Sequence, residues 1–488
     1  MLLRHTTFNL IGLGAPLLVA LVTIPILIPA LGVYRFGLLT LVWAVVSYFG
    51  LFDLGLGRAL TQQLAVALER REHRSTAPLV ATATLLMAAL GILAGLAMAA
   101  LAGWGIDQVR SVPDRQEAVG AIYAMAWAMP AIILTSGFRG VLEARHAFGI
   151  INLIRVPMGL FTFLGPLAVV LYGEPRLDTI TWVLAAGRLA ACVVHGYWAW
   201  RVLPPDHGPL AVRGDMIGPL CVSGGWLTAS NIISPFMGYV DRFVIGALVS
   251  VSAVAYYATP YELVTKLWIV PSALTAVLFP QFAALTGAMT GRAWDTLKQS
   301  VDGLFALIFP LSLVIALFAE ELLRLWIGAE FATHSAVLMQ LFAFGILVNC
   351  LAHVPLALIQ SQGHARLGAI IHCLELPVFL MALGLLTWRY GTLGAALAWL
   401  GRILIDAVAM FHFGGAVAGR SFAAEALSAK VLSHALLVGL AFAGVWIDSW
   451  PIRAGWILLS LIPLLLLMRQ RMQARISPEL NRKDTSDA

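Results

Sequence analysis

The sequence predicts an all-α protein that crosses a membrane about fourteen times. Of its 488 residues, 60% are hydrophobic and 11% are charged, whereas a soluble domain carries roughly 25% charged residues. Apolar runs recur from Phe8 to Met468, and each is long enough to cross a hydrocarbon core of roughly 30 Å. Because the runs lack the alternation of transmembrane strands, and lipid offers backbone groups no hydrogen-bond partner, they predict helices.

The first apolar run is longer than a signal-peptide core and lacks a small-residue cleavage site, so we expect it to be retained as a helix. Each later run of similar length predicts a further helix. The expected helices are 8–32, 36–57, 78–103, 118–138, 151–173, 180–202, 217–249, 253–284, 301–319, 334–358, 367–388, 392–418, 427–447 and 452–468.

Basic residues predict the orientation. With the N-terminus inside, the cytoplasmic segments hold 20 of the 31 lysines and arginines, and the opposite loops hold seven. An inside excess of this kind supports an even number of helices and cytoplasmic N- and C-termini. It also accounts for the net charge of +6 without nucleic acid as a partner.

An internal repeat predicts the domain organisation. Ile28–Leu31, at the end of the first expected helix, lies 217 residues before the similar Ile245–Leu248 at the end of the seventh. A parallel repeat of six helices predicts an N-lobe at 1–215 and a C-lobe at 216–419. Helices 13 and 14, at 420–468, lie outside the repeat, and 469–488 form a basic cytoplasmic tail.

Motifs for catalysis are absent from the sequence. No Gly-Lys dipeptide is present to form a P-loop, and neither His-Glu-x-x-His nor Gly-x-Ser-x-Gly occurs. The four cysteines lie inside apolar runs, where no disulfide framework is expected. We therefore expect no catalytic residue, metal or cofactor, and transport by conformational change.

Charged residues inside the expected helices are the candidate functional residues, because each costs roughly 2.5–3.5 kcal/mol in hydrocarbon unless it faces a cavity or a partner. The basic candidates for a cargo-binding cavity are Arg188, Arg242, Lys266 and Arg402. The acidic candidates, for ion pairing or ion coupling, are Asp241, Glu262, Glu375 and Asp406.

Purely structural roles for these residues stay open. Glu262/Lys266 and Arg402/Asp406 are each spaced four apart, so each pair can form on one helix face and simply hold helices together. Asp241 and Arg242 can snorkel to the interface. Asp53 is expected to cap a helix junction with Arg58. Core hydrogen bonds are more typical than proton relay for His195, His353, His372 and His412.

Several segments, in order, resemble one known family. Phe49–Leu60, Gly140–Phe148 with Asn152 and Arg155, Tyr239–Gly246 with Ala255–Tyr257, and Leu325–Ala332 with Gln360–Gly363 are similar to segments of polysaccharide transporters of the oligosaccharide flippase family. The similarity covers residues 1 to about 420. It implies the multidrug/oligosaccharidyl-lipid/polysaccharide exporter fold, with two six-helix lobes in a V around a central cavity.

The resemblance also implies a function. Such flippases move undecaprenyl-pyrophosphate-linked oligosaccharide to the outer leaflet of the inner membrane for O-antigen, capsule or exopolysaccharide assembly. Family members tend to have basic cavity residues, and Arg242, Lys266 and Arg188 match. The equal number of intramembrane acids departs from that pattern. Polysaccharide polymerase and glycosyltransferases are candidate partners, and this fold usually works as a monomer.

Two other functions remain as alternatives. A drug/cation antiporter on the same fold would hold carboxylates in core helices; the first helix has none, but Glu262 and Glu375 keep this alternative open. A membrane-embedded polysaccharide polymerase or ligase would need a large outer loop, and the longest outward loops, near 104–117 and 320–333, are about fourteen residues.

The C-terminal tail gives a first prediction. Removing residues 469–488 should leave export of the polysaccharide intact, because a polar, basic segment with few apolar residues has no core to support. The measurement is surface polysaccharide in cells that carry the truncated gene. Loss of export at a normal membrane level would show that the tail has a further role.

Overall fold

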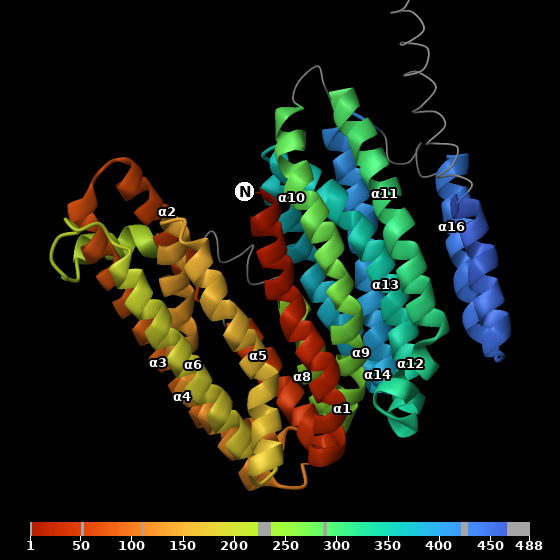
Figure 1. Cartoon of the computed structure of the whole chain (residues 1–488), viewed down its shortest axis with the longest axis horizontal. Helices are drawn as coiled ribbons and strands as arrows, with labels where there is room; N and C mark the ends of the chain where they lie inside the picture. Colours follow the sequence, from red (N-terminus) through yellow and green to blue (C-terminus); the bar gives the residue numbers. More distant parts are fainter. Residues whose placement is uncertain are drawn as a thin grey trace, which may run out of the picture. The chain divides into compact units, whose positions relative to one another are not determined.

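A computed structural model describes residues 2–49, 53–109, 112–222, 236–285, 290–420 and 428–465. All regular elements in these ranges are helices (Figure 1). The chain divides into two compact units. Unit 1 contains Met1–Ala258 and Leu380–Ala395, and unit 2 contains Thr259–Phe379 and Ala396–Ala488.

The described helices confirm an all-α, multi-pass membrane fold. Within the described ranges, nine helices are long and apolar enough to cross a membrane, and Val431–Trp446 and Trp450–Leu465 are shorter apolar helices. The number fourteen stays a prediction, because much of the expected helix 217–249 falls on 223–235, outside the described residues. The predicted tail at 469–488 lies outside them too.

Two long helices change direction at a glycine, close to where the sequence predicts a break between helices. Helix α1 (Leu2–Phe49) covers the expected helix 8–32 and residues 36–49 of the expected helix 36–57, and its backbone turns at Gly32, where φ is 74°. Helix α14 (Ala365–Val417) covers 367–388 and 392–418, and turns at Gly391, where φ is 62°. Glycine adopts positive φ without the steric cost of a Cβ, so each turn can be made without a loop.

Unit 1 is built mainly from helices that approach closely. Figure 1 shows α3, α4 and α6 side by side. A Cβ on Gly91 or Gly95 of α3 would lie within 2.5 Å of the backbone of Pro130 or Ala126 of α4. Small residues four apart permit this approach. The helices of this unit are α1, α2 (Leu56–Glu69), α3 (Thr76–Asp107), α4 (Arg115–Ala144), α5 (Phe148–Tyr172), α6 (Leu177–Arg201) and α8 (Val240–Leu248).

Gly91→Ala is therefore expected to destabilise unit 1 by about 1–3 kcal/mol, the usual cost of overpacking. Its Cβ would collide with the Cα atom of Pro130, and backbone cannot move aside as a flexible side chain does. The measurement is the thermal unfolding midpoint of the purified protein in detergent. Gly105→Ala on the same helix is the matched control, since nothing lies within 4 Å of its Cβ position. Equal midpoints would contradict the close approach.

Buried carboxylates join the ends of helices in unit 1. Asp53 accepts hydrogen bonds from the amides of Gly55 and Gly57, at 3.0 and 2.9 Å, and from the Ser136 hydroxyl at 2.8 Å. Asp53 thus caps a helix junction as predicted, and the part predicted for Arg58 stays a prediction. At another junction, buried Glu117 accepts from Arg35 Nε at 2.8 Å and from the Leu177 amide, which ties α1 and α4 to the start of α6.

Unit 2 has an aromatic core. Trp399 is fully buried, and its ring fills the space that Gly345 leaves beside it. Tyr261 and Phe342 pack edge-on against the same ring. The helices of this unit are the end of α9 (Val251–Thr265), η2 (Lys266–Trp268), α10 (Ile269–Ala284), α11 (Thr290–Leu317), α12 (Ala319–Trp326), α13 (Ala329–Ser361), most of α14, α16 (Ala429–Phe442) and η4 (Ala443–Trp446).

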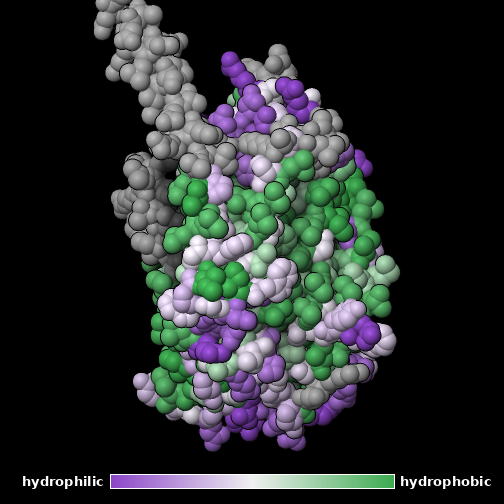
Figure 2. Space-filling model, turned by 90° about the vertical axis from the view of Figure 1, so that its right-hand side faces the viewer, coloured by the Kyte–Doolittle hydropathy of each residue, from purple (hydrophilic) through white to green (hydrophobic). Residues whose placement is uncertain are grey.

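The surface has the pattern of a membrane protein. On the face shown in Figure 2, hydrophobic side chains predominate between the hydrophilic side chains at the top and the bottom, with smaller polar patches among them. Large apolar side chains such as Leu325, Trp388 and Leu436 are more than half exposed. Exposed apolar surface on this scale requires a cover, and the bilayer provides it.

The same kind of cap follows two helices at positions that the predicted repeat would pair. The Ala147 amide donates to the Leu142 carbonyl after α4, and the His364 amide donates to the Ile359 carbonyl after α13. The intervening His146 and Gly363 both have positive φ, at 55° and 85°. Both ends are six-to-one helix caps, and they lie 217 residues apart, the offset found in the sequence.

Candidate functional site

A charged pair occupies the middle of one membrane span in unit 2. Lys266 Nζ lies 3.0 Å from Glu262 Oε2, and the two side chains are 42% and 43% exposed. Lys266 is the sixteenth of the 34 residues in the span Val251–Ala284. Charges so exposed at the centre of a bilayer would be costly in contact with lipid, so this face must meet water or a polar ligand. The predicted Glu262–Lys266 pair is confirmed.

The same position is a break in the helix. Lys266–Trp268 form the 3-10 turn η2 between α9 and α10, and Pro271 follows one turn later. A short 3-10 stretch inside a longer helix often marks a hinge. The Trp268 indole donates to the Asn349 side chain at 2.7 Å, which fixes the start of α10 to α13.

Unit 1 also has a cation near the middle of a membrane span, Arg188. It is the twelfth of the 25 residues of α6 and is half-buried. Among the described residues, its guanidinium has no hydrogen-bond or ion-pair partner. A charge near the middle of a span needs such a partner or a hydrated surface, so Arg188 stays a candidate for cargo contact.

Asp241 and Arg242 lie inside the packing of unit 1. Asp241 is fully buried and accepts a hydrogen bond from the Tyr257 hydroxyl at 2.7 Å. Arg242 is 2% exposed, and its guanidinium lies 4.9 Å from the centre of the Tyr239 ring. Both residues belong to α8, which packs against α1. This arrangement favours a structural role for the pair in the conformation seen here.

The second predicted pair has different partners. Arg402 and Asp406 form no ion pair with each other within the described ranges. Instead, His372 Nε2 lies 3.4 Å from Asp406 Oδ1, and the Arg402 guanidinium lies 5.4 Å from the centre of the Phe379 ring. Glu375 completes this group. Glu375 and Asp406 are both more than nine-tenths buried.

The histidines divide into two kinds. His195 and His353 each bond through Nδ1 to the carbonyl four residues earlier, at 2.8 and 2.9 Å, which confirms the expected core role. His372 faces a carboxylate instead. Sequence reasoning missed this contact because the partners are 34 residues apart, on either side of the turn at Gly391.

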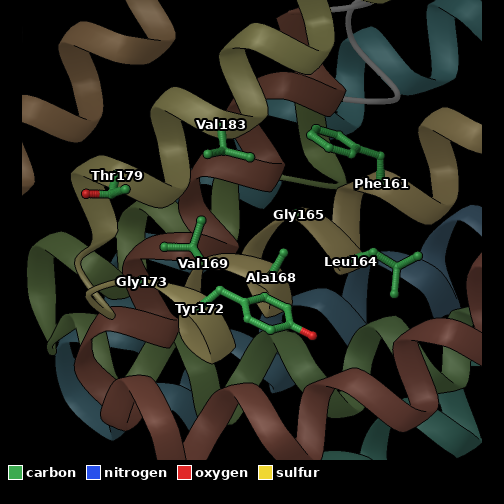
Figure 3. A pocket seen from close by; sticks show the side chains of 9 residues that line it. All are labelled: Phe161, Leu164, Gly165, Ala168, Val169, Tyr172, Gly173, Thr179 and Val183. Carbon is green, nitrogen blue, oxygen red and sulfur yellow. The ribbon is translucent and has the colours of Figure 1, made fainter.

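An open apolar pocket of about 520 Å³ lies between α5 and α6 in unit 1 (Figure 3). Phe161, Leu164, Val169, Tyr172 and Val183 supply most of its wall, and Thr179 adds one hydroxyl. No charged residue lines it. The pocket therefore cannot neutralise an anionic head group, and its chemistry suits hydrocarbon.

The chain is similar in sequence to known proteins of polysaccharide biosynthesis. Residues 2–286 match the family described as polysaccharide biosynthesis protein. A Shigella flexneri protein provisionally named an O-antigen transporter is 27% identical over 412 residues, which cover 83% of this chain and 96% of that protein.

Solved structures share the fold. An inward-facing multidrug transporter of the MATE family has a TM-score of 0.65 at 14% identity, with 85% of this chain and 96% of that chain covered. The lipid II flippase MurJ, in an inward closed conformation, has a TM-score of 0.64 at 11% identity, covering 92% and 99%. Identity this low is evidence for the fold alone.

Proposed function

This chain belongs to the polysaccharide biosynthesis protein family, and we propose that it is a flippase for lipid-linked oligosaccharides. It moves undecaprenyl-pyrophosphate-linked repeat units across the inner membrane by alternating access, for O-antigen, capsule or exopolysaccharide biosynthesis. It is a multi-pass membrane transporter and not an enzyme. The O-antigen transporter assignment of its Shigella flexneri relative supports the cargo class.

The observation that carries the proposal is the presence of a cation near the middle of each of two spans, one without a described protein partner and one partly exposed. Arg188 has no partner among the described residues, and Lys266 is 42% exposed although it bonds to Glu262. A pyrophosphate needs charge-assisted hydrogen bonds to replace its hydration during passage. The planar fork of arginine fits two phosphate oxygens, and lysine provides a point charge.

The predictions made from sequence on lobes, orientation, oligomeric state and partners are included in this proposal. Lobes at 1–215 and 216–419, cytoplasmic termini, a monomeric state, and cooperation with polymerase and glycosyltransferases are all consistent with a flippase. Arg242 and Arg402 stay candidates for cargo contact in another conformation. In the one seen here, Arg242 is buried against Tyr239.

An antiporter for drugs or cations is the second candidate function. The buried carboxylates Glu375 and Asp406 favour it. Flux of a cationic drug that follows an imposed ion gradient, in vesicles that contain only this protein, would support the antiporter over the flippase.

The test of the flippase is depletion of the protein in its native cell, followed by extraction of lipid-linked oligosaccharides and assignment of their leaflet. Accumulation of complete repeat units on the cytoplasmic leaflet, with loss of surface polysaccharide, is expected. Unchanged amounts and distribution would contradict the proposal. Restoring the gene controls for effects on neighbouring genes.

A further inference from the structure

Three side chains in unit 2 converge on one point inside the membrane-spanning helices. His372 and Glu375 lie on the first half of α14, and Asp406 lies on the half that follows the Gly391 turn. One nitrogen or oxygen atom from each lies within 4.8 Å of the other two. We call these three residues the His-Glu-Asp cluster.

The cluster lacks the donors that ionised carboxylates need. Neither oxygen of Glu375, nor Oδ1 of Asp406, has a hydrogen-bond partner in the described part of the chain. Glu375 is 9% exposed and Asp406 is 8% exposed, so bulk water cannot satisfy them fully. A buried charge without a donor is costly. A protonated carboxyl avoids the cost of burying that charge.

The net charge of the cluster and its neighbours is balanced by one bound proton. The other titratable or charged groups that face it from the described helices are Arg402, on the second half of α14, and His353, on α13. These segments pack together through Ala352, Ile371 and Ala407. With both histidines neutral, one guanidinium and two carboxylates sum to a single negative charge, which one bound proton cancels.

A metal ion fits less well. Sodium, magnesium and calcium prefer oxygen ligands, and an imidazole nitrogen is a poor substitute. A zinc-type ion accepts such a nitrogen, but it would add two positive charges where one is needed.

We infer that the His-Glu-Asp cluster is a proton-binding site, in which Glu375 and Asp406 together bind one proton and His372 lies beside the Asp406 carboxylate. Binding itself is independent of the cargo. That the proton drives or gates translocation rests on the proposed flippase function. The inference adds His372 to the predicted coupling residues and specifies the bound ion as a proton.

The test is infrared difference spectroscopy of the purified, full-length protein without cargo, titrated from acidic to alkaline pH. Exposed carboxyls of ordinary pKa are ionised above about pH 6. A carboxylic acid C=O stretching band that remains there and disappears as the pH rises further is expected in the wild type and absent in Glu375→Gln. Glu117→Gln is the matched control. Glu117 is also a buried glutamate, but it is bonded to Arg35 and the Leu177 amide, so this variant should retain the titrating band.

Two further variants keep the test decisive if Glu375→Gln does not fold. Asp406→Asn and His372→Gln should each move the midpoint of the band by about one pH unit or more, because each removes a group that interacts with the bound proton. A band that persists in Glu375→Gln, or unchanged midpoints in both other variants, would overturn the inference. So would stoichiometric, cluster-dependent binding of Zn²⁺ in calorimetry. Because no cargo is present, failure of the flippase proposal would leave these spectra unchanged.

Discussion

Arg188→Ala is expected to reduce polysaccharide export about tenfold while the protein still reaches the membrane at its normal level. A hydrogen bond from a charged group contributes about 1.5–3 kcal/mol, and 1.4 kcal/mol corresponds to about a factor of ten. The loss should fall on transport and not on folding, because Arg188 has no protein partner in the described part of the chain to leave unsatisfied. The measurement is surface polysaccharide per molecule of membrane-inserted protein.

Two further variants on α6 separate the effect of the positive charge of Arg188 from that of its planar guanidinium. Arg188→Lys keeps the charge but loses the planar fork, so it should restore part of the export. Arg201→Ala is the matched control, because Arg201 lies at the end of α6 with its guanidinium over the Tyr197 ring, away from the middle of the span. Normal export in Arg188→Ala, or equal losses in Arg188→Ala and Arg201→Ala, would end the proposed role of Arg188.

The presence of several membrane-spanning helices was the feature most open to sequence reasoning, because the length of an apolar run directly reflects the thickness of the bilayer. The turns at Gly32 and Gly391 fall where the expected helices were separated. The pair Glu262/Lys266 followed from helical spacing alone. These features depend on residues close together in the chain, so local rules were sufficient.

Partners distant in the chain could not be predicted in the same way. Spacing of four residues suggested Arg402–Asp406, but Asp406 lies closer to His372, on the other half of α14. Which partner Asp406 meets depends on how each half of α14 is rotated about its own helix axis. Apolar residues surround most of both halves, so the hydrophobic pattern is compatible with more than one rotation. The 3-10 turn at Lys266–Trp268 was missed for a related reason. Its sequence is compatible with helix, and packing of Trp268 against Asn349 accompanies the break.

Arg453→Ala is expected to cause the largest loss of stability, about 3 kcal/mol, the lower end of the cost of breaking a buried ion pair. Arg453 is 8% exposed, and its guanidinium donates to both Glu321 carboxylate oxygens, to the Leu317 carbonyl and to the Asp448 carbonyl. It therefore fixes the helix Trp450–Leu465 to α11 and α12. The lower end of the range applies because the Glu321 side chain is 42% exposed. The measurement is the thermal unfolding midpoint, with proteolysis of the C-terminal helices as a second readout.

A double-mutant cycle with Glu321→Ala isolates the ion pair from the carbonyl contacts. The neighbouring pair Arg324–Glu320 on α12 is the control, because both side chains are about half exposed and surface pairs contribute about 0–1 kcal/mol. Arg324→Ala should thus leave the midpoint almost unchanged. If Arg453→Ala behaves like Arg324→Ala, packing in the bilayer, and not this ion pair, holds the C-terminal helices. If it instead lowers the midpoint and exposes those helices to protease, one arginine connects the two helices outside the repeat to the repeat itself.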